Sequence, residues 1–225
     1  MTPWELLGKA VVPGQAGELR LYRRGADFSI RADGQELMNS RMHGSEDALA
    51  ELACGRLSGR PLPRVLIGGL GMGFTLATAL RVLHKSARVD VVELVPAVVA
   101  WNKGPLGELA GRPLEDARVV LHDGDVIRLL RTEKEAFDAV LLDVDNGPEA
   151  LTRKSNNWLY SPAGLRKIHE ALKPRGVLAV WSAGPHPVFV QRLRHAGFGV
   201  EEVLVRARDG TRGGHHLIWL ATRLA

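Results

Sequence analysis

Buried strands and amphipathic helices alternate strictly along the chain from residue 64 onward. Strands are expected at 64–68, 87–94, 117–125, 137–145 and 176–183, and helices at 74–84, 96–109, 126–132, 161–172 and 186–197. Strands that alternate with helices form βαβ units, whose strands lie parallel in one sheet. The last segment, 199–223, has the pattern of two strands joined by a turn, so one strand is expected to be antiparallel. The chain is therefore predicted to have an α/β fold with a doubly wound, mostly parallel, seven-stranded sheet.

A different pattern precedes this region. Apolar and polar residues alternate over 18–38, and Gly25 and the pair Asp33 and Gly34 interrupt the alternation. Asp-Gly is a favoured dipeptide in tight hairpin turns, and alternation with a period of two is typical of strands with one buried face. The segment therefore predicts a short antiparallel meander ahead of the main sheet.

A helix is expected over 45–57, between the meander and the main sheet. Ser45 is the expected N-cap, because acidic residues follow it in the first turn and apolar residues recur at helical spacing. We divide the chain on this basis into an N-terminal β-hairpin and helix appendage, residues 1–60, and a main α/β domain, residues 61–225.

The composition is that of an ordinary globular protein, with 45% hydrophobic and 24% charged residues. No apolar run approaches the ~20 residues that cross a bilayer, and the first residues lack the basic start and apolar core of a signal peptide. The single Cys54 cannot form an internal disulfide, and no group of Cys and His has zinc-site spacing. We expect a cytoplasmic protein without a bound metal or a membrane segment.

The formal net charge of +5 raises the question of an acidic partner. The basic residues are scattered over segments such as "RLYRR" and "VRARDGTR" and form no single block. Scattered arginines are typical of a solvated surface, and no RNA-binding signature accompanies them. Nucleic acid is therefore not expected as a partner, and a polyanionic substrate is the alternative.

The stretch "RVLIGGLGMG" places Gly69, Gly71 and Gly73 directly after the first parallel strand. In an open parallel sheet, ligands bind beyond the carboxyl ends of the strands, where the strand order reverses. Glycines let the backbone approach a ligand, and the helix that follows offers free N–H groups. The spacing differs from the dinucleotide pattern G-x-G-x-x-G, and a tight turn with a purely structural role is the alternative.

Acidic residues end the next two strands. Glu93, with Leu94 beside it, stands where the dinucleotide fold places an acid for ribose hydroxyls, and capping of the next helix is the alternative. Asp123, with Gly124 behind it, ends the third strand, where a carboxylate or its neighbouring backbone can accept from the exocyclic amine of adenine. Asp125 is expected either to share that role or to begin the following helix.

The fourth strand ends in Asp143 and Asp145, which enter a turn-rich loop with Asn146. An extended chain points these two carboxylates the same way, and a cation beside them relieves their repulsion. An amine substrate or a sulfonium would serve as that cation. Trp158 and Tyr160 follow the loop as an aromatic wall over the substrate, or alternatively as packing of a lid on the sheet.

The segments above resemble those of the spermidine synthase family, which has the class I S-adenosylmethionine-dependent methyltransferase fold. The resemblance runs from about Leu37 to Trp181. It includes "LMNSRMHGSEDAL", "RVLIGGLGMG", "VDVVEL", "VVLHDGD", "FDAVLLDVDNGP" and "LYSPAGLRKIHEALKPRGVLAV". It implies that the three glycines of the loop line the methionine side of the nucleotide, that Glu93 binds the ribose and that Asp123 meets the adenine. By the same resemblance, Asp143 is the base beside the sulfonium.

The acceptor half departs from the family pattern. The family usually carries an aspartate inside the glycine loop, where this chain has Met72, and a second loop aspartate near Asn146. The tyrosine-histidine-glutamate region is replaced by "GSEDALAEL", and an expected glutamine by Trp181 or Ser182. A diamine needs carboxylates at both ends, whereas the sequence shows one convincing acid, Asp143, and at most two. Putrescine is therefore expected to be a poor acceptor.

The resemblance implies a spermidine synthase-like transferase that uses S-adenosylmethionine or decarboxylated S-adenosylmethionine to alkylate a small amine acceptor. Asp143 would take the proton of the ammonium nucleophile, with Asp145 and Asn146 near the acceptor. One alternative is an S-adenosylmethionine-dependent methyltransferase, which needs only room and one base. The other is a non-catalytic nucleotide-binding module, in which Asp143 is dispensable. A homodimer is a possible assembly.

Overall fold

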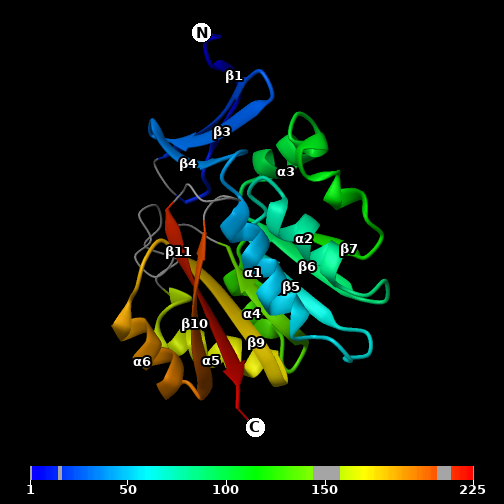
Figure 1. Ribbon diagram of the computed structural model, residues 1–225, viewed down its shortest axis with the longest axis vertical. Coiled ribbons are helices and arrows are strands. Elements are labelled where there is room, and N and C mark those ends of the chain that lie inside the picture. The colour runs from blue at the N-terminus through cyan, green and yellow to red at the C-terminus, as the bar shows by residue number, and fades with distance from the viewer. Residues whose placement is uncertain (1, 15–16, 144–157, 207–213, 225) are drawn as a thin grey trace.

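The computed structural model describes residues 2–14, 17–143, 158–206 and 214–224. Its main sheet has seven strands in the order β10-β11-β9-β8-β5-β6-β7 (Figure 1). Their bounds are β5 Arg64–Gly68, β6 Arg88–Glu93, β7 Val119–Asp123, β8 Phe137–Leu142, β9 Leu172–Ser182, β10 Phe198–Arg206 and β11 His215–Arg223. Strands β5 to β9 run parallel, and β11 is antiparallel to both β9 and β10. The predicted α/β sheet, mostly parallel with one antiparallel strand, is confirmed.

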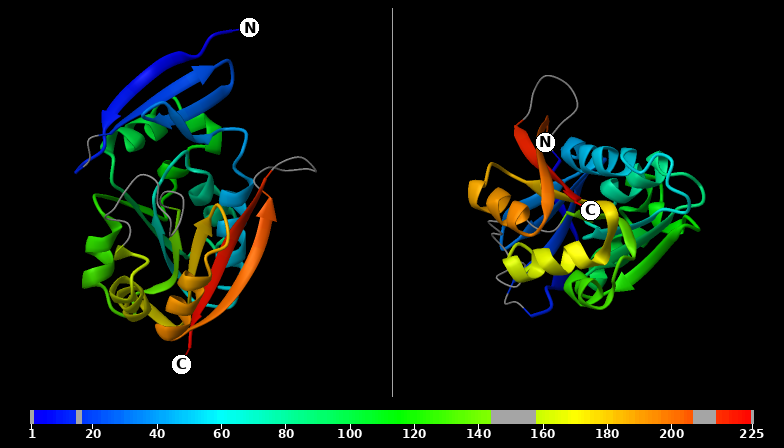
Figure 2. Two further views of the ribbon diagram at one scale, coloured as in Figure 1. Left: turned by 90° about the vertical axis from the view of Figure 1, so that its left-hand side faces the viewer. Right: turned by 90° about the horizontal axis from the view of Figure 1, so that it is seen from below.

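Helices cover both faces of this sheet (Figure 2). Their bounds are α1 Gly44–Gly55, α2 Phe74–Val82, α3 Pro96–Lys103, α4 Val126–Thr132, α5 Pro162–Ala171 and α6 Pro187–His195. Successive residues of a strand point to opposite faces, so Ile67 packs in the core with α1, α2 and α3, whereas Leu66 packs in the core with α4, α5 and α6. Among the described residues, no helix is long and apolar enough to cross a membrane.

The helix predicted over 96–109 ends early, at Lys103. Gly104 and Pro105 follow, and two short 3₁₀ helices, Gly107–Ala110 and Pro113–Glu115, lead to β7. Proline lacks the N–H that would continue the helix and disfavours helical geometry in the residue before it. Pro105 therefore ends the helix before residue 109, where the sequence pattern predicts its end.

A second, smaller sheet lies over one end of the main sheet (Figures 1 and 2). It is antiparallel in the order β1-β2-β3-β4, with bounds Glu5–Val11, Glu18–Arg24, Asp27–Ala32 and Gln35–Asn39. The predicted meander is therefore one strand too small, because β1 was not recognised. Gly8 interrupts the alternation of apolar and polar residues in β1. A Cβ on Gly8 would lie 2.7 Å from Nε1 of Trp101. Glycine thus allows β1 to approach α3 closely.

Helix α1 begins differently from the prediction. His43 occupies the N-cap position, and Ser45 lies inside the helix, where its hydroxyl donates to Glu46. The prediction of Ser45 as N-cap is wrong. The side chain of Cys54 is buried on α1 like a small apolar residue, and burial raises the pKa of its thiol to about 12.

Helix α1 packs beside α2 and against the main sheet, and Leu49 and Ala53 join the same buried cluster as Ile67 of β5. The helix that the prediction assigns to the N-terminal appendage therefore shares the core of the main sheet. The division between residues 60 and 61 stays a prediction.

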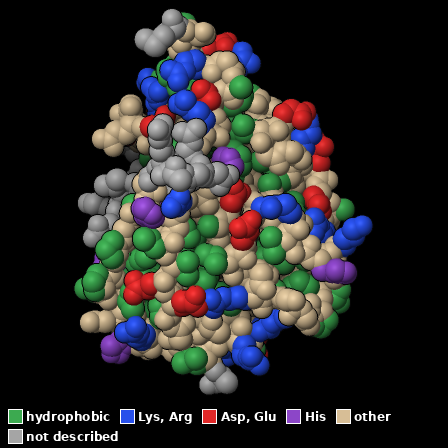
Figure 3. All heavy atoms as spheres, viewed as in Figure 1, with side chains coloured by type: hydrophobic (Ala, Val, Ile, Leu, Met, Phe, Trp, Pro, Cys, Tyr) green, Lys and Arg blue, Asp and Glu red, His purple; other side chains and the backbone are tan. Residues whose placement is uncertain are grey.

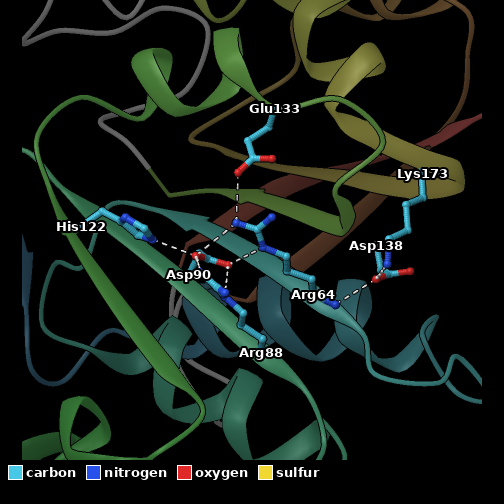
Figure 4. Close-up of polar contacts among 7 residues, drawn as sticks. All are labelled: Arg64, Arg88, Asp90, His122, Glu133, Asp138 and Lys173. Atoms are coloured by element: carbon cyan, nitrogen blue, oxygen red, sulfur yellow. Dashed lines mark hydrogen bonds and ion pairs between the residues drawn. The ribbon is translucent and has the colours of Figure 1, made fainter.

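Buried ion pairs close the amino-terminal side of the main sheet (Figure 4). Asp90 of β6 is fully buried, and its Oδ2 accepts a hydrogen bond from Arg64 at 2.8 Å. Its Oδ1 accepts from Arg88 at 2.9 Å and lies 2.7 Å from Nε2 of His122. Burial alone would raise the pKa of Asp90, but these three partners lower it to about 2. A carboxylate buried without such partners would be costly.

A second buried carboxylate, Asp138 of β8, lies beside the first network (Figure 4). It accepts from the backbone N–H of Arg64 at 2.8 Å, from Arg60 at 2.9 Å and from Lys173 at 2.7 Å. Arg64 therefore touches both buried acids, one with its side chain and one with its backbone. This residue ties the start of β5 to β6 and β8.

Replacement of Asp90 by asparagine should destabilise the protein by about 2 kcal/mol, because it removes the charge that three cationic or hydrogen-bonding partners surround. The folded pKa of Asp90 is lowered from 3.8 to about 2. Its contribution is therefore fully present above about pH 4 and is lost as the pH falls through about 2. Urea unfolding at pH 7 and at acidic pH measures this contribution.

Asp116→Asn is the matched control, since Arg118 likewise lowers the pKa of Asp116 to about 2. The side chain of Asp116 is 31% exposed and that of Asp90 is fully buried, so solvent screens the control pair and its loss should cost less. Equal losses of stability in the two variants would contradict the prediction.

Candidate functional site

The glycine loop follows β5 at the point where the strand order reverses, between β6 and β8. Gly69, Gly71 and Gly73 have φ values of +93°, +53° and +87°, a region that side chains with a Cβ rarely adopt. The first two line the cavity described below, whereas Gly73 begins α2 and faces Asn102, whose amide lies 3.0 Å from where a Cβ would be. Met72, which replaces the family's usual aspartate, is buried.

Glu93 ends β6 and is buried against this loop. One carboxylate oxygen accepts from the N–H of Leu70 at 2.8 Å, and the other accepts from the N–H of Val95 at 2.9 Å, where α3 begins. Burial raises the pKa of Glu93, and the backbone hydrogen bonds oppose that shift. A carboxylate has about four acceptor positions, so Glu93 can hold these two N–H groups and still face the cavity. The helix-capping alternative and the ligand role are therefore compatible.

At the end of β7, the acid that lines the cavity is not the one predicted to face the ligand. Asp123 is exposed, and the described cavity lining does not include it, whereas Gly124 and Asp125 belong to that lining. Asp125 also accepts from the N–H of Ile127 at 2.9 Å and so caps α4. Of the two roles expected for Asp125, helix capping is confirmed.

Asp143 follows β8 at the edge of the cavity. Its carboxylate accepts from the hydroxyl of Thr75 on α2 at 2.7 Å, and its N–H donates to the carbonyl of Gly68 at 3.0 Å. Burial raises the pKa of Asp143, and the hydrogen bond from Thr75 partly opposes the shift. The side chain is thus held in place beside the glycine loop, as expected for a residue that meets the reacting group.

A cavity of about 480 Å³ joins these strand ends to the N-terminal sheet. That volume is within the range of small-molecule sites. Its lining includes six carboxylates: Asp33, Glu36, Glu46, Glu93, Asp125 and Asp143. Within the described part of the chain, no Lys, Arg or His lines it. The cavity therefore has a negative field and suits a cationic ligand.

Three of the six acids in this lining were not among the residues predicted from the sequence, and which carboxylates hold an acceptor stays a prediction. Asp33 and Glu36 come from the turn and strand at β3 and β4, and Glu46 comes from the first turn of α1. They lie far from the strand ends in sequence and reach the cavity because the N-terminal sheet covers those ends. An acid in the first helical turn is also explained by the helix dipole, so Glu46 gave no distinct signal.

Glu46 and Asp143 act on each other across the cavity. Burial raises the pKa of Glu46 to about 7, and the negative charge of Asp143 is the second largest cause of this shift. The hydroxyl of Ser45 donates to Glu46 at 2.7 Å and partly opposes the shift. The repulsion between the two carboxylates therefore favours a protonated Glu46 near neutral pH.

The outside of the N-terminal sheet contrasts with the cavity. Figure 3 shows Lys and Arg side chains there, with Asp and Glu side chains among them. Many are paired: Arg23 bonds Glu5 at 2.8 Å, and Arg24 lies 3.8 Å from Asp27. The basic charge on this surface is therefore partly neutralised and does not form the continuous stripe typical of a nucleic-acid site.

Leu94, the neighbour of Glu93, also lines the cavity, whereas the described lining includes neither Trp158 nor Tyr160. Tyr160 is buried in the core with α5 and α6, 5.5 Å from Phe189 ring to ring, and Arg131 lies over the ring of Trp158 at 4.5 Å. This geometry favours the alternative of packing for both aromatics. Asp145 and Asn146 lie outside the described residues.

The sequence model of the spermine/spermidine synthase domain matches residues 54–191, more than half of the chain. The chain belongs to the spermine/spermidine synthase family. Its curated relatives include a polyamine aminopropyltransferase of Prochlorococcus marinus, 30% identical over 54% of this chain and 41% of that protein. Polyamine aminopropyltransferase 1 of Streptomyces coelicolor is 35% identical over 57% of this chain and 24% of that protein. The matched region thus spans less than half the length of these relatives.

Solved structures agree with this family in fold. Spermidine synthase in complex with the transition state analogue AdoDATO has a TM-score of 0.74 at 17% identity, over 97% of this chain and 72% of that one. Spermidine synthase from Thermotoga maritima has a TM-score of 0.75 at 17% identity, over the same shares. The likeness covers the N-terminal sheet as well as the main sheet, since it includes nearly the whole chain.

Glu46→Gln should stabilise the ligand-free protein at alkaline pH. Burial and the charge of Asp143 raise the folded pKa of Glu46 from 4.5 to about 7. The stability of the wild type is therefore fully present below about pH 4.5 and falls as the pH rises through about 7. Glutamine does not titrate, so we expect a gain of about 1–2 kcal/mol, or a few degrees in melting temperature, at pH 8.

The gain should vanish at pH 4.5, where Glu46 of the wild type is protonated. Glu51→Gln on the same helix is the control, because the side chain of Glu51 is 52% exposed and is paired with Arg81. Thermal unfolding of the three proteins at both pH values gives the comparison. If the melting temperature of Glu46→Gln equals that of the wild type at every pH, the prediction that Glu46 is protonated near neutral pH is contradicted.

Proposed function

We propose that this protein is an aminopropyltransferase that moves the aminopropyl group of decarboxylated S-adenosylmethionine to a diamine or polyamine. The observation that carries the proposal is the cavity at the strand ends, with six carboxylates and no basic side chain among its described lining residues. Polyamines and the sulfonium nucleotide are both cations, so both are attracted to the same negative field. Membership of the spermine/spermidine synthase family supports the same reaction.

The charge of the cavity favours the decarboxylated nucleotide over S-adenosylmethionine. S-adenosylmethionine carries a carboxylate on its methionine side, which would lie among acidic side chains with no Lys, Arg or His in the described lining. Decarboxylation removes that anion and leaves an ammonium, which the same acids attract. We therefore assign the decarboxylated form, and the methyltransferase alternative becomes an outcome of the test.

The glycine loop, Glu93 and Asp125 form the nucleotide half of the proposed site. Gly69 and Gly71 allow the backbone to approach the aminopropyl side, and Glu93 is positioned for the ribose hydroxyls. Asp125 lines the cavity beyond β7. We therefore assign Asp125, in place of Asp123, to the adenine of the nucleotide. Asp33, Glu36 and the pair Glu46 and Asp143 remain for the ammonium groups, so putrescine is within the proposed acceptor class.

The proposed reaction needs one proton acceptor. An ammonium of the amine gives up a proton, and its nitrogen attacks the carbon bound to the sulfonium sulfur. The C–S bond breaks, its electron pair stays on sulfur as a neutral thioether, and a secondary ammonium forms. The leaving group is good, so catalysis consists of alignment and proton removal. Asp143 is the proposed base, and a homodimer and a cytoplasmic location remain predictions from the sequence.

The assay uses the purified chain with decarboxylated S-adenosylmethionine and, in turn, putrescine, spermidine and a monoamine, with mass spectrometry of the products. We expect one aminopropyl group to be added to the diamine or polyamine and much less to the monoamine. Parallel reactions with S-adenosylmethionine should leave every amine unmethylated. Methylation in those reactions, or no modified amine with either nucleotide, would overturn the proposal.

Asp143→Asn should separate catalysis from nucleotide binding. Asparagine keeps an oxygen for the hydroxyl of Thr75 but cannot take a proton, so turnover should fall by about 10²–10⁴-fold. Nucleotide affinity should stay within a few-fold, and the melting temperature should stay close to that of the wild type. Calorimetry, unfolding and turnover are measured on the same preparation. Full turnover with a normal melting temperature would leave a non-catalytic role for Asp143.

A further inference from the structure

A chain of hydrogen bonds leads out of the cavity from Glu46. The hydroxyl of Ser45 lies 2.7 Å from Oε2 of Glu46, and Nδ1 of His216 on β11 lies 3.0 Å from the same hydroxyl. Ser45 is fully buried, whereas His216 is half-buried. The chain thus connects a carboxylate of the cavity to a titratable ring that keeps contact with solvent.

The three groups have the chemistry of a proton relay. A serine hydroxyl both donates and accepts, so it can take a proton from one neighbour while it gives its own to the other. Burial lowers the pKa of His216, which favours the neutral imidazole that can accept a proton. The ring is also held in position, because it packs edge to face against Trp181 of β9 with centroids 4.7 Å apart.

The proposed reaction releases one proton for every aminopropyl group transferred. The carboxylates around the reacting nitrogen must lose that proton before the next turnover, although a cationic substrate or product is close to them. We propose that Ser45 and His216 form the exit for this proton from the pair Glu46 and Asp143. The inference rests on the proposed function and concerns residues that take no part in binding the nucleotide.

Each step of the relay moves one proton. The acceptor ammonium gives its proton to the carboxylate pair, and Glu46 passes one proton to Oγ of Ser45. The original hydroxyl proton of Ser45 moves to Nδ1 of His216, and the imidazolium that forms releases a proton to water. No electron transfer or further reactant is needed, and exchange with solvent resets the hydroxyl and the ring.

Two further carboxylates, Asp143 and Asp47, act on Glu46 and raise its pKa. On α1, Asp47 lies 2.6 Å from Nδ1 of His43, and Asp47 also accepts from Thr78 of α2 at 2.6 Å. At the end of β8, Asp143 faces Glu46 and accepts from Thr75 of α2. From β10, Val205 is the register partner of His216 and Arg206 that of His215. Ser45 therefore forms the direct bridge from Glu46 to β11.

The test compares His216→Ala with His215→Ala in the aminopropyl transfer assay. His215 is the neighbouring exposed histidine on the same strand, so it controls for the loss of an imidazole from β11. His216→Ala should lower kcat by up to about 100-fold, the lower bound of the effect of a lost proton-transfer group. Its nucleotide affinity and melting temperature should stay near those of the wild type. His215→Ala should keep the wild-type kcat.

A purely structural role of His216 would not respond to added base. Imidazole in the buffer should therefore restore part of kcat in His216→Ala, and kcat of this variant should rise with buffer concentration while that of the wild type does not. Ser45→Ala should show the same loss, and Ser45→Thr, which keeps the hydroxyl, should recover activity. Wild-type kcat in both His216→Ala and Ser45→Ala, or no response to imidazole, would overturn the relay.

A binding experiment separates failure of the relay from failure of the proposed function. Calorimetric titration of the wild type with spermidine at pH 7, in buffers of different ionisation enthalpy, should show proton release as the cation displaces the proton of Glu46. Glu46→Gln should release fewer protons. A wild type that binds no polyamine overturns the proposed function and the relay together. Polyamine binding without proton release overturns the relay alone.

Discussion

The buried carboxylate of Glu93 holds together the part of the fold on which the site depends. Its two oxygens accept from the N–H of Leu70 in the glycine loop and from the N–H of Val95 at the start of α3. Both donors belong to segments that the sheet itself does not fix. Without an acceptor, each would be a buried unpaired N–H that costs about 1–3 kcal/mol. One side chain thus positions the loop after β5 relative to the helix after β6.

The two ends of the main sheet have opposite electrostatic roles. At the amino ends of the strands, Asp90 and Asp138 are surrounded by Arg60, Arg64, Arg88 and Lys173, and the charges are neutralised inside the protein. At the carboxyl ends, the acids have no basic partner among the described residues that line the cavity. A chain with a net charge of +5 therefore gathers six carboxylates in one cavity whose described lining has no basic side chain. That segregation makes the cavity selective for cations although the whole protein is basic.

The main sheet and most of the acids that line the cavity at its strand ends could be predicted from the sequence because their signals are local. The alternation of strands and helices gave the topology, and the acids at strand ends, Glu93 and Asp143, are where they were expected. At the end of β7, local signals are not enough, because the sequence pattern does not say whether Asp123 or Asp125 points into the cavity. The structure places Asp125 in the lining, one residue beyond the turn at Gly124.

The acceptor half could not be predicted, because it depends on contacts between distant segments. Glu46 in isolation has the pattern of an acid in the first turn of a helix, and Glu36 has the pattern of a polar residue on a strand. Only the folded arrangement shows that both line the same cavity as Asp143. The pair of histidines in β11 was likewise uninformative until the structure showed Ser45 beside His216.

The N-terminal sheet makes the site a composite of two separately built walls. One wall comes from the loops of the doubly wound sheet, and the other comes from β3, β4 and the first turn of α1. A change of length or charge in the turn at Asp33 and Gly34 alters the second wall without altering the backbone that approaches the nucleotide. Substrate range in such an architecture can diversify through the small sheet while the chemistry of the sulfonium stays the same. The hairpin of β3 and β4 is therefore the natural place to graft a new acceptor preference onto this scaffold.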